Sequence, residues 1–297
     1  MAYSSSALAT KALKDRLNRN IASTYATLSE YQTYKNSESG NIEALKIFTD
    51  GELKISAKAA AHNSFFRGKD ITSKFTSGKL YEVIVDGSFE DIYVGDYFTA
   101  SINGTNVVCR IAGFDIYLHK GDTEFTRHHA VIVPDTSLMN AVMNSSNTTA
   151  NGYKGSAMNT TTMATVKGYL QSTFGDHLLS HRELISSGMD SSLKNAKQRG
   201  WSGASSASLR ETIYVTLMNE VEVYGTPVFG SSKFDIEDCN TQLPLFRLRP
   251  DLIHTRFLWW LRSVVASTDF ASVYGGGNAF CHGASASRGV RPRWLIG

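Results

Sequence analysis

The sequence predicts a fold of the α+β class, because helical spacing and strand composition occupy different parts of the chain. Residues 4 to about 36 have helical periodicity, since Leu13, Leu17, Ile21 and Leu28 recur at steps of four or seven. After Gly68 the sequence changes to short segments rich in Val, Ile, Tyr and Phe. A third observation is a window of very low charge near the C-terminus, which lies between two apolar segments.

The predicted N-terminal helix has a narrow apolar stripe with Lys, Arg and Asn between its members. A lone helix of this kind has to bury its stripe against something else, either its own domain, further copies or a larger assembly. A polar stretch, Asn36 to Asn41, follows the helix and indicates a stop or a linker. We therefore expect a helix for oligomerisation or virion attachment over residues 1–38, a linker over 39–62 and a folded domain over 63–297.

Four segments of the folded domain have strand composition, and turn residues separate them. They are Leu80 to Val85, Tyr93 to Ile102, Val107 to Phe114 and Ala130 to Val133. The strongest hairpin signal is Asn103-Gly104 between two apolar runs. Ser137 to Met143 is compatible with a helix. A helical face is predicted further on, and its members are Met163, Val166, Leu170, Phe174, Leu178 and Leu179.

Composition excludes several classes of protein. With 42% hydrophobic and 19% charged residues, the chain is neither a disordered tail nor a coiled-coil rod. A net charge of +3 is too weak to imply nucleic acid as a partner, and no apolar run has the length of a membrane span, so we expect no membrane insertion. The N-terminus lacks the apolar stretch of a secretory leader. Three cysteines make no disulfide scaffold, and Cys109 and Cys239 have the character of core residues.

The low-charge window covers residues 264–287 and holds one formal charge, Asp269, besides His282. It is rich in Tyr, Ser, Gly and Asn, which binding loops favour because they combine contact area with adaptable hydrogen bonds. Gly275 to Gly277 allow a tight turn. Every residue type in the window can be reached from an Asn codon by changing its first two bases. This is compatible with adenine-directed mutagenesis, and also with an ordinary Gly-, Ser- and Ala-rich loop over a β core.

The segments around the window resemble a known family. Trp259-Trp260-Leu261-Arg262-Ser263 before it and Gly289-Val290-Arg291-Pro292-Arg293-Trp294 after it resemble the C-type-lectin-like domain of phage and gut-bacterial variable proteins. This fold is shared with formylglycine-generating enzymes, and many of the variable proteins, including those like the major tropism determinant, are diversified by retroelements. Upstream segments, such as Tyr93 to Tyr97 and Gly113 to Tyr117, are similar to tail or virion proteins of gut Firmicutes phages. The resemblance covers residues 63–297.

The resemblance implies a compact α+β domain whose last strand, Val290 to Ile296, pairs with an early strand near Leu80 to Val85. It implies a variable display segment, residues 264–288, that binds a host surface protein or glycan. The implied contact residues are Asp269, Ser272, Tyr274, Gly276, Asn278, Phe280, His282, Gly283, Ala286 and Arg288. The implied scaffold residues are Trp259, Arg262, Phe270, Gly289, Arg291 and Pro292. Relatives often form trimers in the virion, so the expected partners also include further copies and other virion proteins.

Catalytic and metal sites have weak signals. His177, His181 and Glu183 lack the zincin order, so surface or capping histidines are expected there. His128 and His129 would point to opposite faces of a strand. Calcium would need more oxygen ligands than Asp269 and Asn278 offer. We therefore expect no catalytic role, no cofactor and no metal.

Three functions stay open. The first is a receptor-binding virion protein of the phage tail or another exposed surface, assembled in the host cytoplasm. The second is a structural virion protein, such as a head decoration or baseplate subunit. The third is a glycan-active enzyme, which would need paired carboxylates in one cleft; the window contains no such pair.

Overall fold

The computed structural model describes residues 58–188, 208–230 and 240–297. The chain divides into two compact units, Met1–Ala57 and Lys58–Gly297, and the second is described here. The predicted N-terminal helix, most of the linker and Cys239 lie outside the described residues. The last residues of the expected linker form helix α5 (Lys58–His62), where the His62 side chain bonds to the carbonyl of Ile92 at 2.6 Å, so they belong to the folded unit.

The larger of two main sheets has six strands. Their order is β1-β2-β3-β13-β5, and β8 also pairs with β13; every pair is antiparallel. The strands are β1 (Tyr97–Ile102), β2 (Thr105–Phe114), β3 (Ala130–Pro134), β5 (Leu178–Leu179), β8 (Val215–Leu217) and β13 (Pro292–Ile296). All five residues of β13 are buried, so the C-terminal segment forms the centre of this sheet.

The predicted hairpin of β1 and β2 is confirmed, and so is the strand predicted at Ala130 to Val133, which is β3. Ile102 faces Thr105 across the turn, and Asn103 and Gly104 both have positive φ, 49° and 74°. Asn-Gly is the sequence that tolerates this two-residue turn best. The first strand starts later than predicted, at Tyr97, because Tyr93 to Asp96 form a turn closed by the Asp96 N–H on the Tyr93 carbonyl.

The segment Leu80 to Val85 is a helix, so the prediction of an early strand there is wrong. Helix α7 (Lys79–Val85) buries Leu80 and Ile84, which are four residues apart and share one helical face. A short apolar run does not distinguish a strand from a buried helix. The last strand, β13, pairs instead with β3, where Trp294 faces Ile132.

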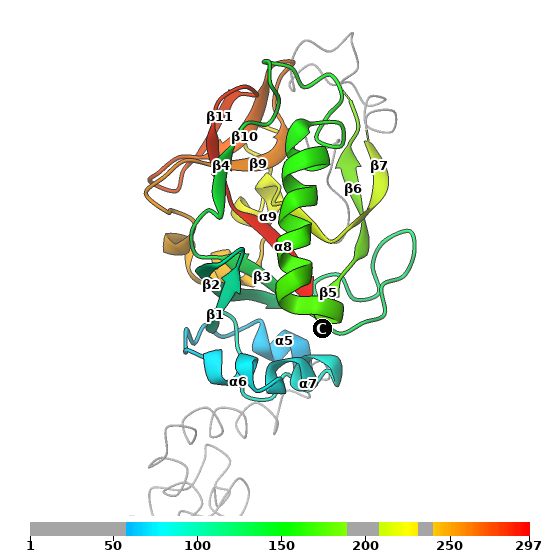
Figure 1. Ribbon diagram of the computed structural model, residues 1–297, viewed down its shortest axis with the longest axis vertical. Helices are drawn as coiled ribbons and strands as arrows, with labels where there is room; N and C mark the ends of the chain where they lie inside the picture. The colour runs from blue at the N-terminus through cyan, green and yellow to red at the C-terminus, as the bar shows by residue number, and fades with distance from the viewer. Residues whose placement is uncertain (1–57, 189–207, 231–239) are drawn as a thin grey trace, which may run out of the picture. The chain divides into compact units, whose positions relative to one another are not determined.

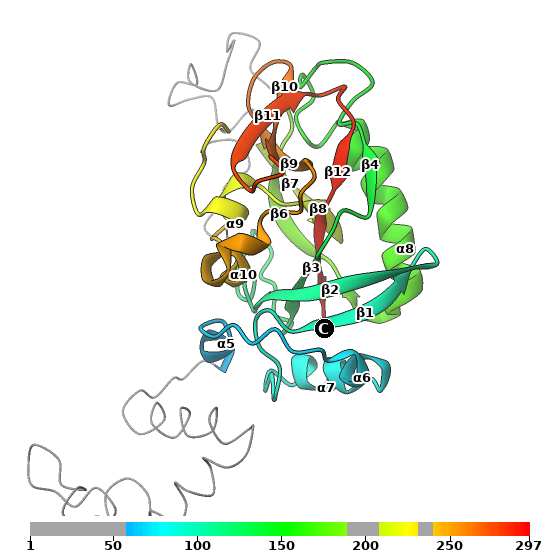
Figure 2. The same ribbon diagram turned by 90° about the vertical axis from the view of Figure 1, so that its left-hand side faces the viewer.

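The second main sheet has the order β11-β10-β9-β12-β4. Its strands are β4 (Met139–Ala141), β9 (Trp259–Val264), β10 (Asp269–Val273), β11 (Ala279–Gly283) and β12 (Arg288–Val290). The helix expected over Ser137 to Met143 is therefore a short strand, which pairs with β12. Only Arg291 separates β12 from β13, so the end of the chain runs from one sheet into the other (Figures 1 and 2).

A two-stranded sheet and short helices complete the unit. The small sheet consists of β6 (His181–Ser186) and β7 (Ser208–Ile213). The helices are α6 (Thr72–Thr76), α8 (Ala164–Phe174), α9 (Glu220–Tyr224) and α10 (Pro244–Leu248), with a π-helical turn at Met158–Met163 and 3-10 turns at Gly175–His177 and Pro250–Leu252. Helix α8 buries Val166, Leu170 and Phe174, which confirms the predicted face, whereas Leu178 and Leu179 belong to β5.

The described unit is thus a mixed fold, mostly β, built on curled and mainly antiparallel sheets, in which β12 and β9 form a parallel pair. This confirms the α+β class in its coarse form. Within the described ranges, none of the helices combines the length and the apolar character needed to traverse a lipid bilayer.

A buried network of charged side chains joins the sheets. Arg293 on β13 donates to Glu183 on β6, at 2.5 and 2.7 Å, and to Glu222 on α9, at 2.5 Å. Arg262 on β9 donates to the same Glu183 at 2.8 Å, and the Tyr117 hydroxyl donates to Glu222 at 2.7 Å. Burial alone would raise the pKa of Glu183, but the charges of Arg262 and Arg293 hold it well below its ordinary value.

This network corrects the interpretation of His181 and Glu183. His181 was expected as a surface or capping histidine, yet it is only 5% exposed, and its neighbour Glu183 is fully buried. The His181 ring lies 4.3 Å from the ring of Tyr117, and its Nε2 is 3.4 Å from Glu183. Glu183 is therefore the counter-ion of two arginines, and its role is to hold three sheets together.

Candidate binding surface

The display segment forms a regular hairpin at the end of the second sheet. Strands β10 and β11 pair without a bulge, from Asp269 opposite Gly283 to Val273 opposite Ala279. The Tyr274 N–H donates to the Asn278 carbonyl, and the Gly277 N–H donates to the Tyr274 carbonyl, both at 2.8 Å. In both views this hairpin lies at the end of the unit far from α5, α6 and α7 (Figures 1 and 2).

Most of the predicted contact residues reach the surface. Tyr274 is 49% exposed and Phe280 is 43% exposed. The other exposed positions are Gly276 and Asn278, and the half-buried ones are Asp269, His282, Gly283, Ala286 and Arg288. Ser272 is fully buried, so the prediction that it contacts a partner is wrong.

Ser272 is buried because large neighbours flank it on both sides. It lies opposite Trp260 on β9 and opposite Phe280 on β11. Its hydroxyl is 2.9 Å from Nδ1 of His282, which shares the same face of the hairpin. Ser272 therefore positions His282 and does not itself meet a partner.

Three rings form a row along one face of this hairpin, which we call the display face. The ring centroids of Tyr274 and Phe280 are 6.0 Å apart, and those of Phe280 and His282 are 4.9 Å apart. The buried Trp260 lies on the neighbouring strand β9, opposite Ser272, and its ring meets that of His282 edge-on at 6.2 Å. Partial burial and the charge of Arg288 lower the pKa of His282, so its imidazole is neutral at pH 7.

The turn between the strands rests on the body of the protein. The Tyr224 hydroxyl of α9 donates to the Gly277 carbonyl at 3.0 Å. A Cβ atom on Gly275 would lie 2.9 Å from the carbonyl oxygen of Arg256, whereas one on Gly276 would meet only the Asn278 side chain, at 3.5 Å. Gly275 is thus required for close contact with the body, and Gly276 has room for a side chain.

A polar loop fixes the two flanks of the hairpin. The Asn147 side-chain oxygen accepts from the N–H and the hydroxyl of Ser285, at 2.9 and 2.7 Å. The Thr149 hydroxyl donates to the Ala266 carbonyl at 2.6 Å, and the Thr149 N–H donates to Ser267. The role of Asn147 and Thr149 in holding the hairpin is not predicted from the sequence. Short polar side chains that bond to backbone groups are a recognisable signal only when the partner segment is known.

Further exposed apolar side chains were also missed. Phe257 is 74% exposed and precedes β9, on a loop whose backbone lies against Gly275. Val228 and Phe229, 50% and 40% exposed, lie on a separate loop whose N–H groups donate to the carboxylate of the buried Glu220. The position of Phe257 beside the turn adds it to the candidate surface.

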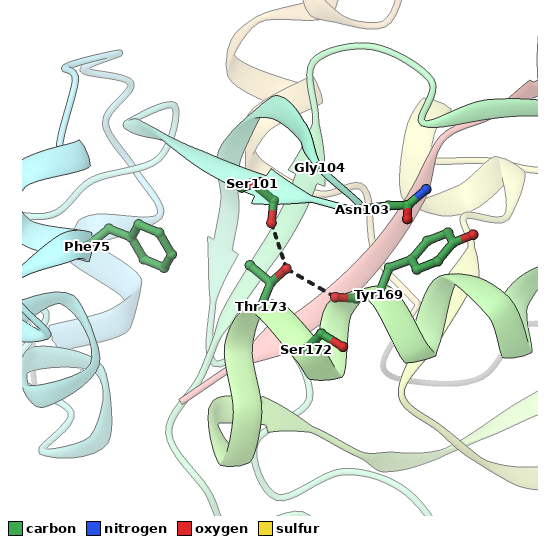
Figure 3. A pocket seen from close by; sticks show the side chains of 7 residues that line it. All are labelled: Phe75, Ser101, Asn103, Gly104, Tyr169, Ser172 and Thr173. Carbon is green, nitrogen blue, oxygen red and sulfur yellow. Dashed lines mark hydrogen bonds between the residues drawn. The ribbon is translucent and has the colours of Figure 1, made fainter.

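A shallow pocket of about 490 Å³ lies between the β1–β2 turn and helix α8 (Figure 3). Its lining residues are Phe75, Ser101, Asn103, Gly104, Tyr169, Ser172 and Thr173. The Thr173 hydroxyl donates to the Ser101 carbonyl at 2.8 Å, which joins the hairpin to the helix. The lining contains no carboxylate, histidine, cysteine or lysine, so the pocket offers no acid–base pair.

The remaining catalytic candidates are buried or separated. Glu183 and Glu222 both bond to Arg293 in the interior, out of reach of a substrate. Burial raises the pKa of Cys281, which disfavours a thiolate nucleophile. Among the described residues, no three His, Cys, Asp or Glu side chains are placed to hold a metal ion together.

Comparison of the chain with protein-family models, with curated protein sequences and with solved structures gives no match. The function is therefore argued from the residues and their geometry.

Proposed function

We propose that this chain is the receptor-binding protein of a phage virion, and that the display face recognises a protein or glycan on the host surface. The observation that carries the proposal is the row of the exposed Tyr274 and Phe280 with the half-buried His282, on a hairpin whose turn and flanks are fixed by side chains outside it. Rigid aromatic side chains supply contact area with little loss of conformational entropy on binding. Aromatic residues are also enriched at the centres of interfaces.

The C-type-lectin-like assignment belongs to the same proposal. The burial of Trp259, Arg262, Phe270, Gly289, Arg291 and Pro292 supports their role as the frame of a variable segment. A Cβ atom on Gly289 would lie 2.2 Å from the Ser137 hydroxyl, so this position accepts only glycine without a shift of its neighbours. In this proposal the chain is located on the tail or another exposed part of the virion, and it acts as a homotrimer.

A structural virion protein is the second candidate. The loop that exposes Val228 and Phe229 favours it, because paired apolar side chains on an ordered loop suit a contact with a neighbouring subunit. Under this alternative the display face has no partner, and variants of the Val228 loop would impair assembly.

The two candidate functions predict different behaviour of the purified chain toward host cells, because only a receptor-binding protein should bind to them. We expect the full chain, fluorescently labelled, to bind intact cells of at least one strain in a panel of gut Firmicutes. Replacing Tyr274, Asn278 and Phe280 together by Ala should weaken that binding at least tenfold, which corresponds to about 1.4 kcal/mol. The matched control replaces Val228 and Phe229 by Ala, which removes exposed apolar groups elsewhere and should leave binding unchanged. Equal binding by the triple variant and the wild type would reject the receptor-binding role.

A further inference from the structure

We infer that the partner presents an extended peptide segment that adds to the outer edge of strand β11. This inference rests on the proposed function, and it selects a protein over a glycan as the partner. It starts from the position of β11, which is the outermost strand of its sheet and pairs with β10 on one side.

The hydrogen bonds of the hairpin determine which backbone groups of β11 point outward. The Tyr274 N–H donates to the Asn278 carbonyl, and the Ala284 N–H donates to the Thr268 carbonyl. Bonded and non-bonded pairs alternate along an antiparallel ladder. Phe280 and His282 therefore direct their N–H and carbonyl groups to β10, whereas Ala279, Cys281 and Gly283 direct theirs to the outer edge.

Within the described part of the chain, little occupies that edge. The Gly283 carbonyl accepts from the Ala286 N–H at 2.9 Å, but no described backbone group bonds to the N–H or carbonyl of Ala279 or Cys281. Native edge strands are commonly protected by Lys, by Pro, by a bulge or by shortness. The sequence of β11, AFCHG, contains neither Lys nor Pro, and its pairing with β10 has no bulge. The strand at the opposite edge, β4, has only three residues.

The chemistry of the edge selects the occupant. Alternating N–H and carbonyl groups at strand spacing are matched by the backbone of another strand, as in known cases of strand addition. A sugar offers hydroxyl groups without this repeat. Backbone bonds also do not depend on side chains. An edge of this kind would hold its partner while Phe280 and His282, beside it on the display face, set the specificity.

A second copy of this chain fits the edge less well than a foreign segment. Two identical antiparallel strands pair about a two-fold axis, and such an interface is isologous. Such pairing joins two copies and does not by itself build the three-fold assembly that the proposed function includes. The inference therefore commits to an extended segment of the host surface protein.

The experiment compares Cys281→Pro with Cys281→Ala in the full chain. Proline lacks the N–H that Cys281 directs outward, but it leaves the hydrogen bonds between β11 and β10 intact. Edge strands tolerate proline at such a position. We expect Cys281→Ala to bind the responsive cells within twofold of wild type, and Cys281→Pro to bind at least tenfold more weakly. Equal binding by the two variants would overturn the inference. If the Tyr274, Asn278 and Phe280 triple variant nevertheless lost binding to cells, the proposed function would still stand.

Two measurements on the wild type keep the inference testable even if Cys281→Pro does not fold. Binding should be lost after the cells are treated with proteinase K and should survive periodate oxidation of their glycans. The reverse pattern would show a glycan partner and overturn the inference. A wild type that sediments as a larger species than Cys281→Pro would assign the edge to a second copy, which overturns it as well.

Discussion

Replacing Arg293 by Met will lower the free energy of unfolding by about 3–5 kcal/mol, because one partner of a buried ion pair is removed and the other is left without compensation. Arg293 is 1% exposed and is bonded to two carboxylates, Glu183 and Glu222. Glu183 would retain Arg262, but among the described residues Glu222 would keep only the Tyr117 hydroxyl and the Asn219 N–H as donors. Methionine fills similar space, so most of the loss would be electrostatic.

Urea unfolding of the full chain, followed by tryptophan fluorescence, measures this change, since Trp259, Trp260 and Trp294 are buried in the same unit. Arg249→Ala is the control. Arg249 bonds to Asp251 with two hydrogen bonds, at 2.8 and 2.6 Å, but both side chains are about half exposed, 42% and 52%. Because exposed ion pairs contribute little to stability, the control should cost much less than Arg293→Met. An Arg293→Met variant as stable as Arg249→Ala would show that the network contributes little.

Lowering the pH from 7 to 5 will cost about 2 kcal/mol of stability through His129 alone. Burial lowers the pKa of His129 from 6.5 to about 3. Its Nε2 accepts the Tyr117 N–H at 3.1 Å and its Nδ1 bonds to the Arg127 carbonyl at 2.9 Å, so neither nitrogen has room for a further proton. The unfolded chain therefore binds more protons between the two pKa values, and stability falls as the pH falls through this window.

The matched variant is His129→Gln, since a Gln amide can still accept from Tyr117 and donate to the Arg127 carbonyl. Unfolding free energies of the wild type and His129→Gln at pH 7 and pH 5 give the difference directly. We expect the acid-induced loss to be about 2 kcal/mol smaller in the variant. An identical loss in both proteins would mean that His129 is protonated in the folded state.

Local patterns in the sequence were sufficient for some elements of the fold. The Asn103-Gly104 hairpin was predictable because its signal lies within the turn itself, where both residues have positive φ. The buried face of α8 was predictable because Val166 and Leu170 repeat at helical spacing. The helix at Leu80 to Val85 was not predictable, because a short apolar run fits a strand and a buried helix equally well until the elements that cover it are known.

The candidate surface was predictable only in part, for a similar reason. Low charge and aromatic content identified the segment that carries Tyr274 and Phe280. The burial of Ser272 depends on its cross-strand neighbours, Trp260 and Phe280, and a single sequence does not reveal which residues face each other across strands. The burial of Glu183 likewise depends on residues distant in sequence, because Arg262 and Arg293 stabilise its charge in the interior.

The central claim is that the display face carries side chains that can change while the scaffold keeps its structure. The unfolding free energy of the Tyr274, Asn278 and Phe280 triple Ala variant tests this claim most directly. These side chains are exposed, so surface-type substitutions should leave the value within about 1 kcal/mol of wild type. A loss of about 3 kcal/mol or more, typical of core truncation, would show that the three side chains hold the fold together and would contradict the account.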